Sequence, residues 1–144
     1  MRLSHKGRAL LTQMEGKSNH VYEDVAGFKT IGIGHLLKLG ETMTYLTDEQ
    51  IDDLLDDDLS KFELAVTIGV HVPLTQHQFD ALVIFAFNVG VTAFSTSTLV
   101  KKLNAGDYNS VPSQLMRWNK AGGKVVSGLT NRRKKEIELW EGIK

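Results

Sequence analysis

"EGKSNHVYEDVAGFKTIGIGH", residues 15–35, holds three carboxylates, one threonine, four glycines and two histidines in twenty-one positions. Its Val, Tyr, Phe, Thr and Ile residues favour strands, and we expect two short strands around a turn at residues 25–27. Gly32 and Gly34 weaken the second strand, which is typical of a close approach of the backbone to another group. The segment therefore predicts a β-hairpin within a chain that is otherwise patterned as helices.

The remaining periodicity is helical. Ser4 and Gly16 are suitable cap and stop residues for a short first helix. Thr47 and Gln50 form a capping box before the clearest helix, whose length of about 20 residues corresponds to roughly 30 Å. A second capping box opens a helix that is apolar almost all round and ends at Gly90. The helices are expected over 4–14, 47–68, 75–89, 97–104, 108–118 and 129–141, with a loop over 120–128.

These elements predict an α+β, mostly helical fold of two lobes in a single domain over 1–144. We expect a small hairpin lobe over about 15–46 and a connecting helix over about 47–68. A helical lobe would follow over about 69–144, with the first helix packed on it. A cleft between two lobes is the usual place for a ligand.

Composition excludes several classes of site. The 144-residue chain contains no cysteine, so it has no disulfide, thiol nucleophile or zinc–thiolate site. Its five histidines show no metal-ligand spacing, and we expect neither a metal nor a cofactor. The acidic run at 52–58 lacks the glycine and the terminal glutamate of a calcium loop and is interpreted as a solvated helix face.

The net charge of zero conceals an asymmetry. Residues 1–72 hold 7 Lys/Arg and 12 Asp/Glu, whereas residues 73–144 hold 10 and 5. The basic half could attract nucleic acid, an anionic membrane or bacterial cell wall, or the charges could be solvated helix faces. The start lacks the apolar core of a secretory signal and no long apolar run follows, so we expect synthesis in a cytoplasm.

Three residues of the opening segment suit the cleavage of an acetal. Glu15 stands at a predicted helix C-terminus, where the helix dipole disfavours the ionised form, so it is a candidate proton donor. Asp24 and Thr30 flank the hairpin turn and could hold one water molecule between them. An acid that faces a carboxylate is the pair of groups with which glycoside hydrolases cleave their substrates. The alternative is structural, because Glu at a helix end, Asp at a turn and Thr in a strand are all common.

Glu15, Asp24 and Thr30, followed by "IGIGH", resemble the catalytic signature of the phage-type lysozymes, the T4-like members of glycoside hydrolase family 24. "LTQHQFDALVIFAFNVG", "AFSTSTLVKKLNAGDY" and "RWNKAGGKVVSGLTNRRKKEIELW" resemble later segments of that family in the same order. The resemblance implies an endolysin that hydrolyses the β-1,4 bond between N-acetylmuramic acid and N-acetylglucosamine in peptidoglycan and so lyses the host cell.

When the family's residue roles are carried over by position, the resemblance implies that Glu15 is the general acid. It also implies that Asp24 and Thr30 hold the attacking water. It makes Gly34 and His35 neighbours of the sugar cleft. Inversion at the anomeric carbon fits a threonine-held water, and retention stays open. One substrate contact of the family falls near Pro112, so that side of the cleft could differ. The residues implied to contact substrate are Leu36, Phe87 and Thr98.

The resemblance also implies a partner and a location. Peptidoglycan would be the substrate, nucleic acid no partner, and the chain a monomer that does not insert stably into membranes. It would wait in the host bacterial cytoplasm for a holin-type pore and then act on the cell wall. A non-catalytic peptidoglycan-binding module is the alternative, and a nucleic-acid-binding helical protein would need a recognition helix that the sequence does not show.

Other residues favour structural interpretations. His35 is expected to hold a hydrogen bond, with the aspartates at 56–58 as candidate partners, and Glu23 is expected to point into water. The segment "NRRKKEIELWEG" suits a helix packed on the second lobe, and its cations could steer the protein toward anionic wall polymers. A membrane-disrupting helix is the alternative there. Trp118, Trp140, Phe85 and Phe94 are expected in the core, and Phe87 is expected at the cleft.

Overall fold

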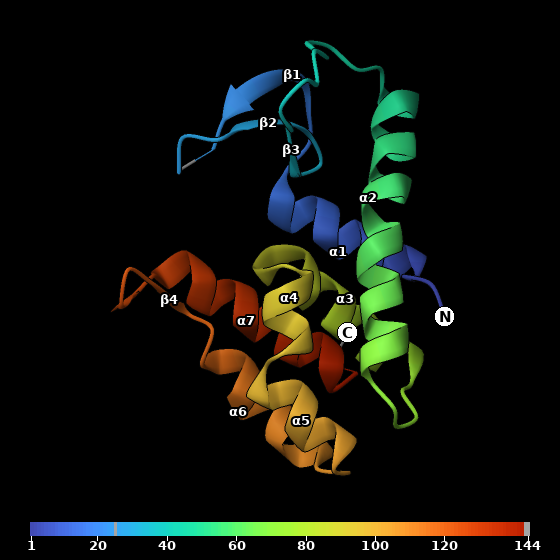
Figure 1. Ribbon diagram of the computed structural model, residues 1–144, viewed down its shortest axis with the longest axis vertical. Coiled ribbons are helices and arrows are strands. Elements are labelled where there is room, and N and C mark those ends of the chain that lie inside the picture. Colours follow the sequence, from blue (N-terminus) through green and yellow to red (C-terminus); the bar gives the residue numbers. More distant parts are fainter. Residues whose placement is uncertain (25, 143–144) are drawn as a thin grey trace.

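The computed structural model describes residues 1–24 and 26–142, so Val25 of the predicted turn lies outside it, as do residues 143–144. A small sheet stands at one end of the long helix α2, and the other helices gather around its opposite end (Figure 1). The helices are α1 (His5–Glu15), α2 (Asp48–Gly69), α3 (Gln76–Val89), α4 (Val91–Ser95), α5 (Thr98–Asn104), the 3-10 helix η1 (Tyr108–Ser110), α6 (Val111–Met116) and α7 (Ser127–Trp140). The strands are β1 (Ser18–Glu23), β2 (Lys29–Gly32), β3 (His35–Leu36), β4 (Lys120–Ala121) and β5 (Lys124–Val125).

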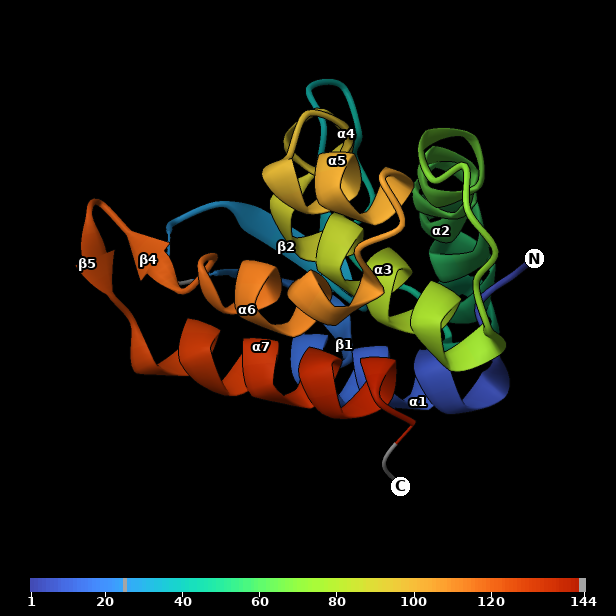
Figure 2. The same cartoon turned by 90° about the horizontal axis from the view of Figure 1, so that it is seen from below.

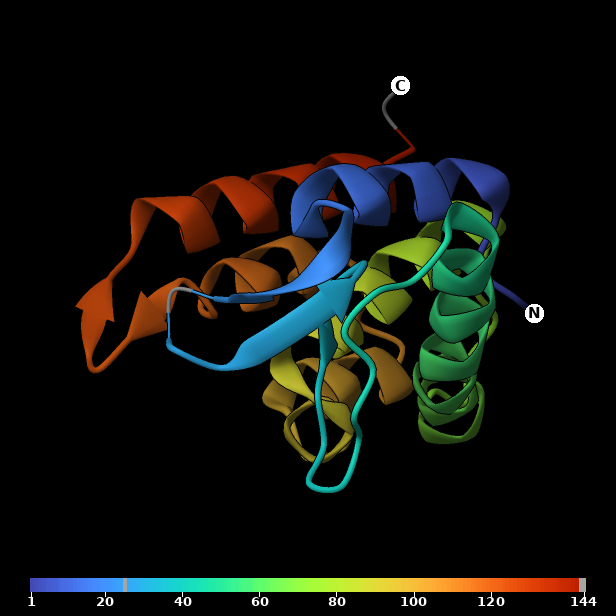
Figure 3. The same cartoon turned by 90° about the horizontal axis from the view of Figure 1, so that it is seen from above.

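The predicted hairpin is confirmed. β1 and β2 pair antiparallel, with Tyr22 opposite Thr30, and β3 adds a third strand to β2. The Asp24 N–H donates to the Phe28 carbonyl at 2.9 Å, which closes the turn. Figure 3 shows this sheet in front of the helices, alongside the upper part of α2. The hairpin thus brings the flanks of its turn together, as the sequence indicated.

Both capping boxes form. The Thr47 hydroxyl accepts from the Gln50 N–H at the start of α2, and the Thr75 hydroxyl accepts from the Gln78 N–H at the start of α3. Eight consecutive residues of α3, from 79 to 86, are buried, as its all-round apolar pattern predicted. Among the described residues, no helix is long and apolar enough to cross a membrane.

Three expectations for the second half were wrong in detail. The predicted loop at 120–128 contains the two-stranded hairpin β4–β5, and α7 begins at Ser127. The single helix expected over 108–118 is divided into η1 and α6, where Pro112 stands in the first turn of α6. The five-residue helix α4 was not expected. The limits expected for the two lobes, 15–46 and 69–144, stay a prediction.

Helix α1 is fixed on α3 by a buried carboxylate. The Ser4 N–H donates to Asp80 Oδ1 at 3.0 Å, the Ser4 hydroxyl donates to Asp80 Oδ2, and the Gln76 amide donates to Oδ1 at 2.8 Å. Gly7 lies directly over this carboxylate, because a Cβ placed on it would approach Asp80 Cγ to 2.9 Å. Figures 2 and 3 show α1 and α7 along one side of the molecule with α3 inside them. The contact therefore anchors the start of α1 on α3.

Replacing Gly7 with alanine should destabilise the protein by about 1–3 kcal/mol, because the added methyl group would overlap with Leu3 and Asp80. Helix propensity alone predicts the opposite sign, a gain of up to about 1 kcal/mol. Gly128 in α7 is the matched control, because a Cβ there would meet nothing within 4 Å and Gly128→Ala should stabilise slightly. Urea unfolding measures both, and equal effects of the two substitutions would contradict the packing argument.

Candidate active site

Glu15 is the last residue of α1, and Gly16 follows it with φ of +76°. Its side chain is 19% exposed, and its Oε2 accepts a hydrogen bond from Arg132 Nη1 at 2.5 Å. The other oxygen faces Gly34, where a Cβ would lie 2.8 Å from Glu15 Oε1. Gly34 thus makes the close approach that the sequence predicted, while the nearest atom to a Cβ on Gly32 would be Ile51 Cγ2 at 3.6 Å.

Arg132 holds the glutamate from the far end of the chain. Its Nη2 donates to the Ile84 carbonyl at 3.2 Å, and its Nε donates to Glu136 Oε2 at 3.3 Å. Sequence reasoning placed this arginine among steering cations, but its side chain is only 10% exposed. The spacing of Arg132 and Glu136, four residues apart on a helix, was the one signal of pairing. Only Lys134 and Lys135 of the basic run are exposed.

Arg133 and Glu136 form an ion pair in the core. Both side chains are 0% exposed, and Arg133 Nη2 donates to Glu136 Oε2 at 3.1 Å and to Asn88 Oδ1 at 2.6 Å. Its guanidinium carbon lies 5.1 Å from the centre of the Phe85 ring. Burial raises the pKa of Glu136 to about 7, and the charge of Glu15 adds to this, against the opposing effect of the two arginines.

Asp24 and Thr30 lie on the hairpin. Asp24 Oδ1 accepts from the N–H groups of Ala26 and Phe28, each at 2.9 Å, so the turn orients this carboxylate. Thr30 is 2% exposed, and its hydroxyl donates to the Phe28 carbonyl at 3.1 Å. The Thr30 oxygen can therefore still accept a hydrogen bond from another molecule.

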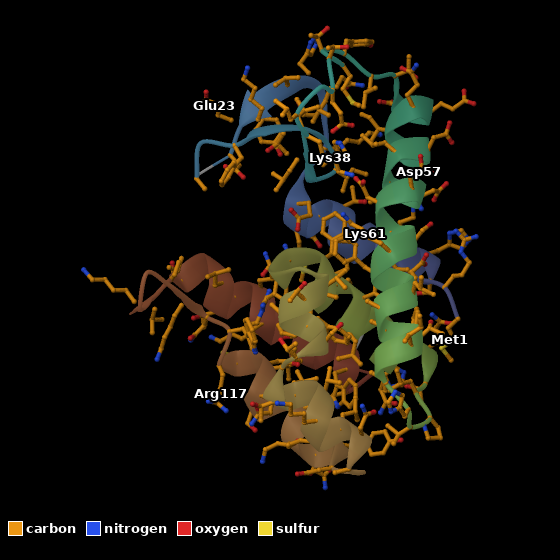
Figure 4. All side chains as sticks on the ribbon, viewed as in Figure 1. Met1, Glu23, Lys38, Asp57, Lys61 and Arg117 are labelled. Carbon is orange, nitrogen blue, oxygen red and sulfur yellow. The ribbon has the colours of Figure 1, made fainter. Side chains whose placement is uncertain are left out.

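Tyr22 lies within reach of the charges of both acids, and the sequence analysis did not single it out. Burial raises its pKa, and the charges of Glu15 and Asp24 both raise it further. Tyr22 also lies opposite Thr30 in the sheet. Both carboxylates are consequently close enough to act on one phenol. Glu23 is exposed on the outer part of β1, as expected (Figure 4).

His35 holds two segments together. Its Nδ1 lies 2.7 Å from Asp58 Oδ2 on α2, and its Nε2 lies 3.2 Å from Glu41 Oε1 in the loop before α2. A backbone hydrogen bond from Lys38, with the neighbouring His35, lowers the pKa of Glu41. The expected aspartate partner is therefore confirmed as Asp58, whereas Asp56 contacts Arg8. Among the described residues, no group of three His, Cys, Asp or Glu could hold a metal ion.

Two pockets contain the residues that were expected to contact substrate. The first, of about 290 Å³, is lined by both Leu36 and Phe87, together with His35, Phe62 and Lys61. Figure 4 shows Lys38 and Lys61 at the level where the sheet and the helices meet α2. Thr98 does not join this pocket. It lines a second one, of about 280 Å³, with Gln114, Arg117 and Trp118.

Glu15 thus ends a helix, and the hairpin that follows it carries Asp24 and Thr30. The comparisons with known proteins define the class as a glycoside hydrolase of the lysozyme type. A family model described as phage lysozyme matches residues 12–136. The chain belongs to the phage lysozyme family. The endolysin of Acyrthosiphon pisum secondary endosymbiont phage 1 is 40% identical in an alignment that covers 98% of this chain and 99% of the relative.

Solved structures agree with this assignment. The endolysin from Escherichia coli O157:H7 phage FAHEc1 has a TM-score of 0.87 and 37% identity, with 97% of this chain and 93% of that chain covered. The muramidase domain of SpmX from Asticaccaulis excentricus has a TM-score of 0.85 and 34% identity, with 96% and 97% covered. The expected mostly helical α+β, lysozyme-like fold is confirmed.

The buried carboxyl of Glu136 should give the folding free energy a distinct pH dependence. Its pKa of about 7 in the folded state exceeds the ordinary value of 4.5, so the folded protein binds this proton more tightly. The stabilisation is complete below pH 4.5 and is lost as the pH rises through 7, a change of about 3 kcal/mol. We expect the unfolding free energy of the wild type, relative to Glu136→Gln, to fall by this amount between pH 4.5 and 8.

Urea unfolding at several pH values measures the difference. Glu138→Gln removes a carboxyl two residues away on the exposed face of α7 and should follow the wild-type curve. Parallel curves for the wild type and Glu136→Gln would contradict the shifted titration.

Proposed function

We propose that this protein is a muramidase that hydrolyses the β-1,4 bond between N-acetylmuramic acid and N-acetylglucosamine in bacterial peptidoglycan, with Glu15 as the general acid. The observation that carries the proposal is the position of the Glu15 carboxyl. It is mostly buried between Arg132 and Gly34 and lies close to the Asp24-bearing hairpin. The match to a muramidase domain and to endolysins supports the choice of substrate.

In this mechanism Glu15 donates a proton to the glycosidic oxygen as the bond breaks. Arg132 then stabilises the carboxylate that remains, because its Nη1 already contacts Oε2. Asp24 and Thr30 hold the water that attacks the sugar carbon. Thr30 accepts a hydrogen bond from this water, and the Asp24 carboxylate takes the proton that the water loses as its oxygen bonds to the carbon. Attack by this water gives inversion, whereas a covalent bond to Asp24 would give retention. The anomeric form of the first product distinguishes the two.

Substrate contacts follow from the two pockets. Leu36 and Phe87 supply apolar surface for sugar rings in the first pocket. Thr98 offers a hydroxyl in the second pocket, so it contacts a more distant part of the glycan strand or its peptide. The basic half of the chain attracts the anionic wall. We also propose that the protein is a monomer that accumulates in the host cytoplasm, leaves through a holin-type pore and then acts on the wall.

Glu15→Gln should reduce the clearing of outer-membrane-stripped bacteria by at least about 100-fold, because the amide cannot donate the proton that the leaving oxygen needs. Turbidity at 600 nm measures this. Glu23→Gln is the matched control and should clear at the wild-type rate, since Glu23 is exposed. Equal clearing by the wild type and Glu15→Gln would defeat the catalytic role. Wall binding without clearing by either protein would indicate a non-catalytic binding module.

Gly34→Ala should lower kcat by about 100-fold, because the new methyl group would displace the Glu15 carboxyl from its position. Gly32→Ala is a control with nearly the same backbone demand, since φ is +66° at Gly32 and +68° at Gly34. A methyl group at Gly32 makes only ordinary contacts, so that variant should lose stability but keep its activity. Steady-state kinetics with a soluble muropeptide measures both, and equal kcat values for the two variants would refute the displacement.

A further inference from the structure

An apolar groove lies between the end of α2 and the helices α4 and α5 (Figure 1). We call it the α2/α5 groove. Its volume of about 700 Å³ is more than twice the volume of about 290 Å³ of the pocket that contains Leu36 and Phe87. Leu64 and Ile68, one turn apart on α2, line it and are 56% and 64% exposed, and Val91 of α4 is 36% exposed. The groove thus leaves a row of large apolar side chains open to solvent.

The charges that line the α2/α5 groove are cationic. Lys61 on α2 and Lys101 on α5 both line it and are both exposed. Among the described residues that line it, none is acidic. The acidic residues of α2 lie over 48–58, apart from Glu63, which is buried and accepts from the Leu3 N–H at 2.7 Å. An apolar groove bordered by lysines is complementary to an amphiphile with a negative head group.

The polar groups of the groove favour an acyl chain over a peptide as its occupant. Asn104 Nδ2 donates to the Gly69 carbonyl at 2.8 Å, and Asn104 Oδ1 accepts from the His71 N–H at 2.7 Å. Because these groups are already bonded within the protein, a peptide backbone laid in the groove would find few partners for its own donors and acceptors. A hydrocarbon chain has no such groups, so it loses nothing by leaving water for this groove.

We propose that the α2/α5 groove is a docking surface for bilayers of anionic phospholipid. Leu64 and Ile68 contact acyl chains at the bilayer surface, while Lys61 and Lys101 bind the phosphate head groups. A few apolar side chains and two lysines give a weak and reversible attachment, and the electrostatic part of it is screened by salt. The proposal goes beyond wall hydrolysis and does not depend on the role of Glu15.

Sedimentation of the full chain with phospholipid vesicles tests the apolar part of the surface. The wild type should bind vesicles that contain equal parts of phosphatidylglycerol and phosphatidylcholine, and not vesicles of phosphatidylcholine alone. Replacing Leu64 and Ile68 together with serine should weaken this binding about tenfold, because the acyl-chain contacts are lost. Replacing Val125 and Val126 together with serine is the matched control, since these two are also exposed but lie at β5. The control should bind as the wild type does.

Charge reversal tests the cationic part of the surface. Lys101→Glu should weaken binding to the phosphatidylglycerol vesicles about tenfold, because each lysine near an anionic surface contributes to the attraction. Lys120→Glu makes the same charge change on β4, outside the groove, and should have at most about a twofold effect. Circular dichroism checks that each variant is folded, as expected for substitutions at exposed positions.

Two results would overturn the docking surface: no vesicle binding by the wild type, or equal binding by the wild type and both groove variants. Soluble polyglutamate provides a third arm. If it binds the wild type and not the variant with serine at 64 and 68, the occupant is an acidic peptide and the assignment to lipid is overturned. All of these measurements are made without wall substrate, so their failure is distinguishable from a failure of the proposed function.

Discussion

The contact between Glu15 and Arg132 joins residues that are 117 positions apart and is the contact on which the site depends. It places the end of α1 against α7, beside the sheet that begins at Ser18. Gly16 and Gly34 allow this arrangement, the first by ending the helix and the second by giving the carboxyl room. Because one partner comes from each end of the chain, the acid is in place only after both ends have folded onto α3.

A buried cluster of two arginines and one glutamate supports that contact at an energetic cost. Taking Arg133 and Glu136 out of water is unfavourable, and their mutual attraction offsets this only where the geometry is good. Arg133 Nη1 has no hydrogen-bond partner among the described residues, so the compensation is incomplete. An apolar pair would fill the same space more simply. The charged cluster nevertheless gives Arg132 a partner in the core, so that this arginine stands between the carboxyl groups of Glu136 and Glu15.

Local signals predicted much of the fold. The capping boxes at Thr47 and Thr75 determined where α2 and α3 start, because they depend on neighbours within three residues. The change of apolar period after Gly16 gave the hairpin for the same reason. The two-residue strands β3, β4 and β5 carry too few residues for a period to be visible, so they could not be predicted. Helix α4 is only five residues long and directly follows Gly90, which ends α3. It too is too short for an apolar period to be visible.

The residues of the candidate site also divide into those that a local pattern predicted and those that it did not. Glu15, Asp24 and Thr30 were predicted because a helix end and a hairpin turn locate them within one short segment. Arg132 was not, since its burial results from the packing of α7 on α3, which no local pattern expresses. A run of basic residues predicts a solvent-exposed helix face, because the sequence alone does not show which side chains turn inward. Lys134 and Lys135 do face solvent, whereas Arg133 is buried in the core and the Arg132 side chain is only 10% exposed. One turn of helix thus carries both solvent-exposed cations and the arginine that contacts Glu15, and only the tertiary structure separates them.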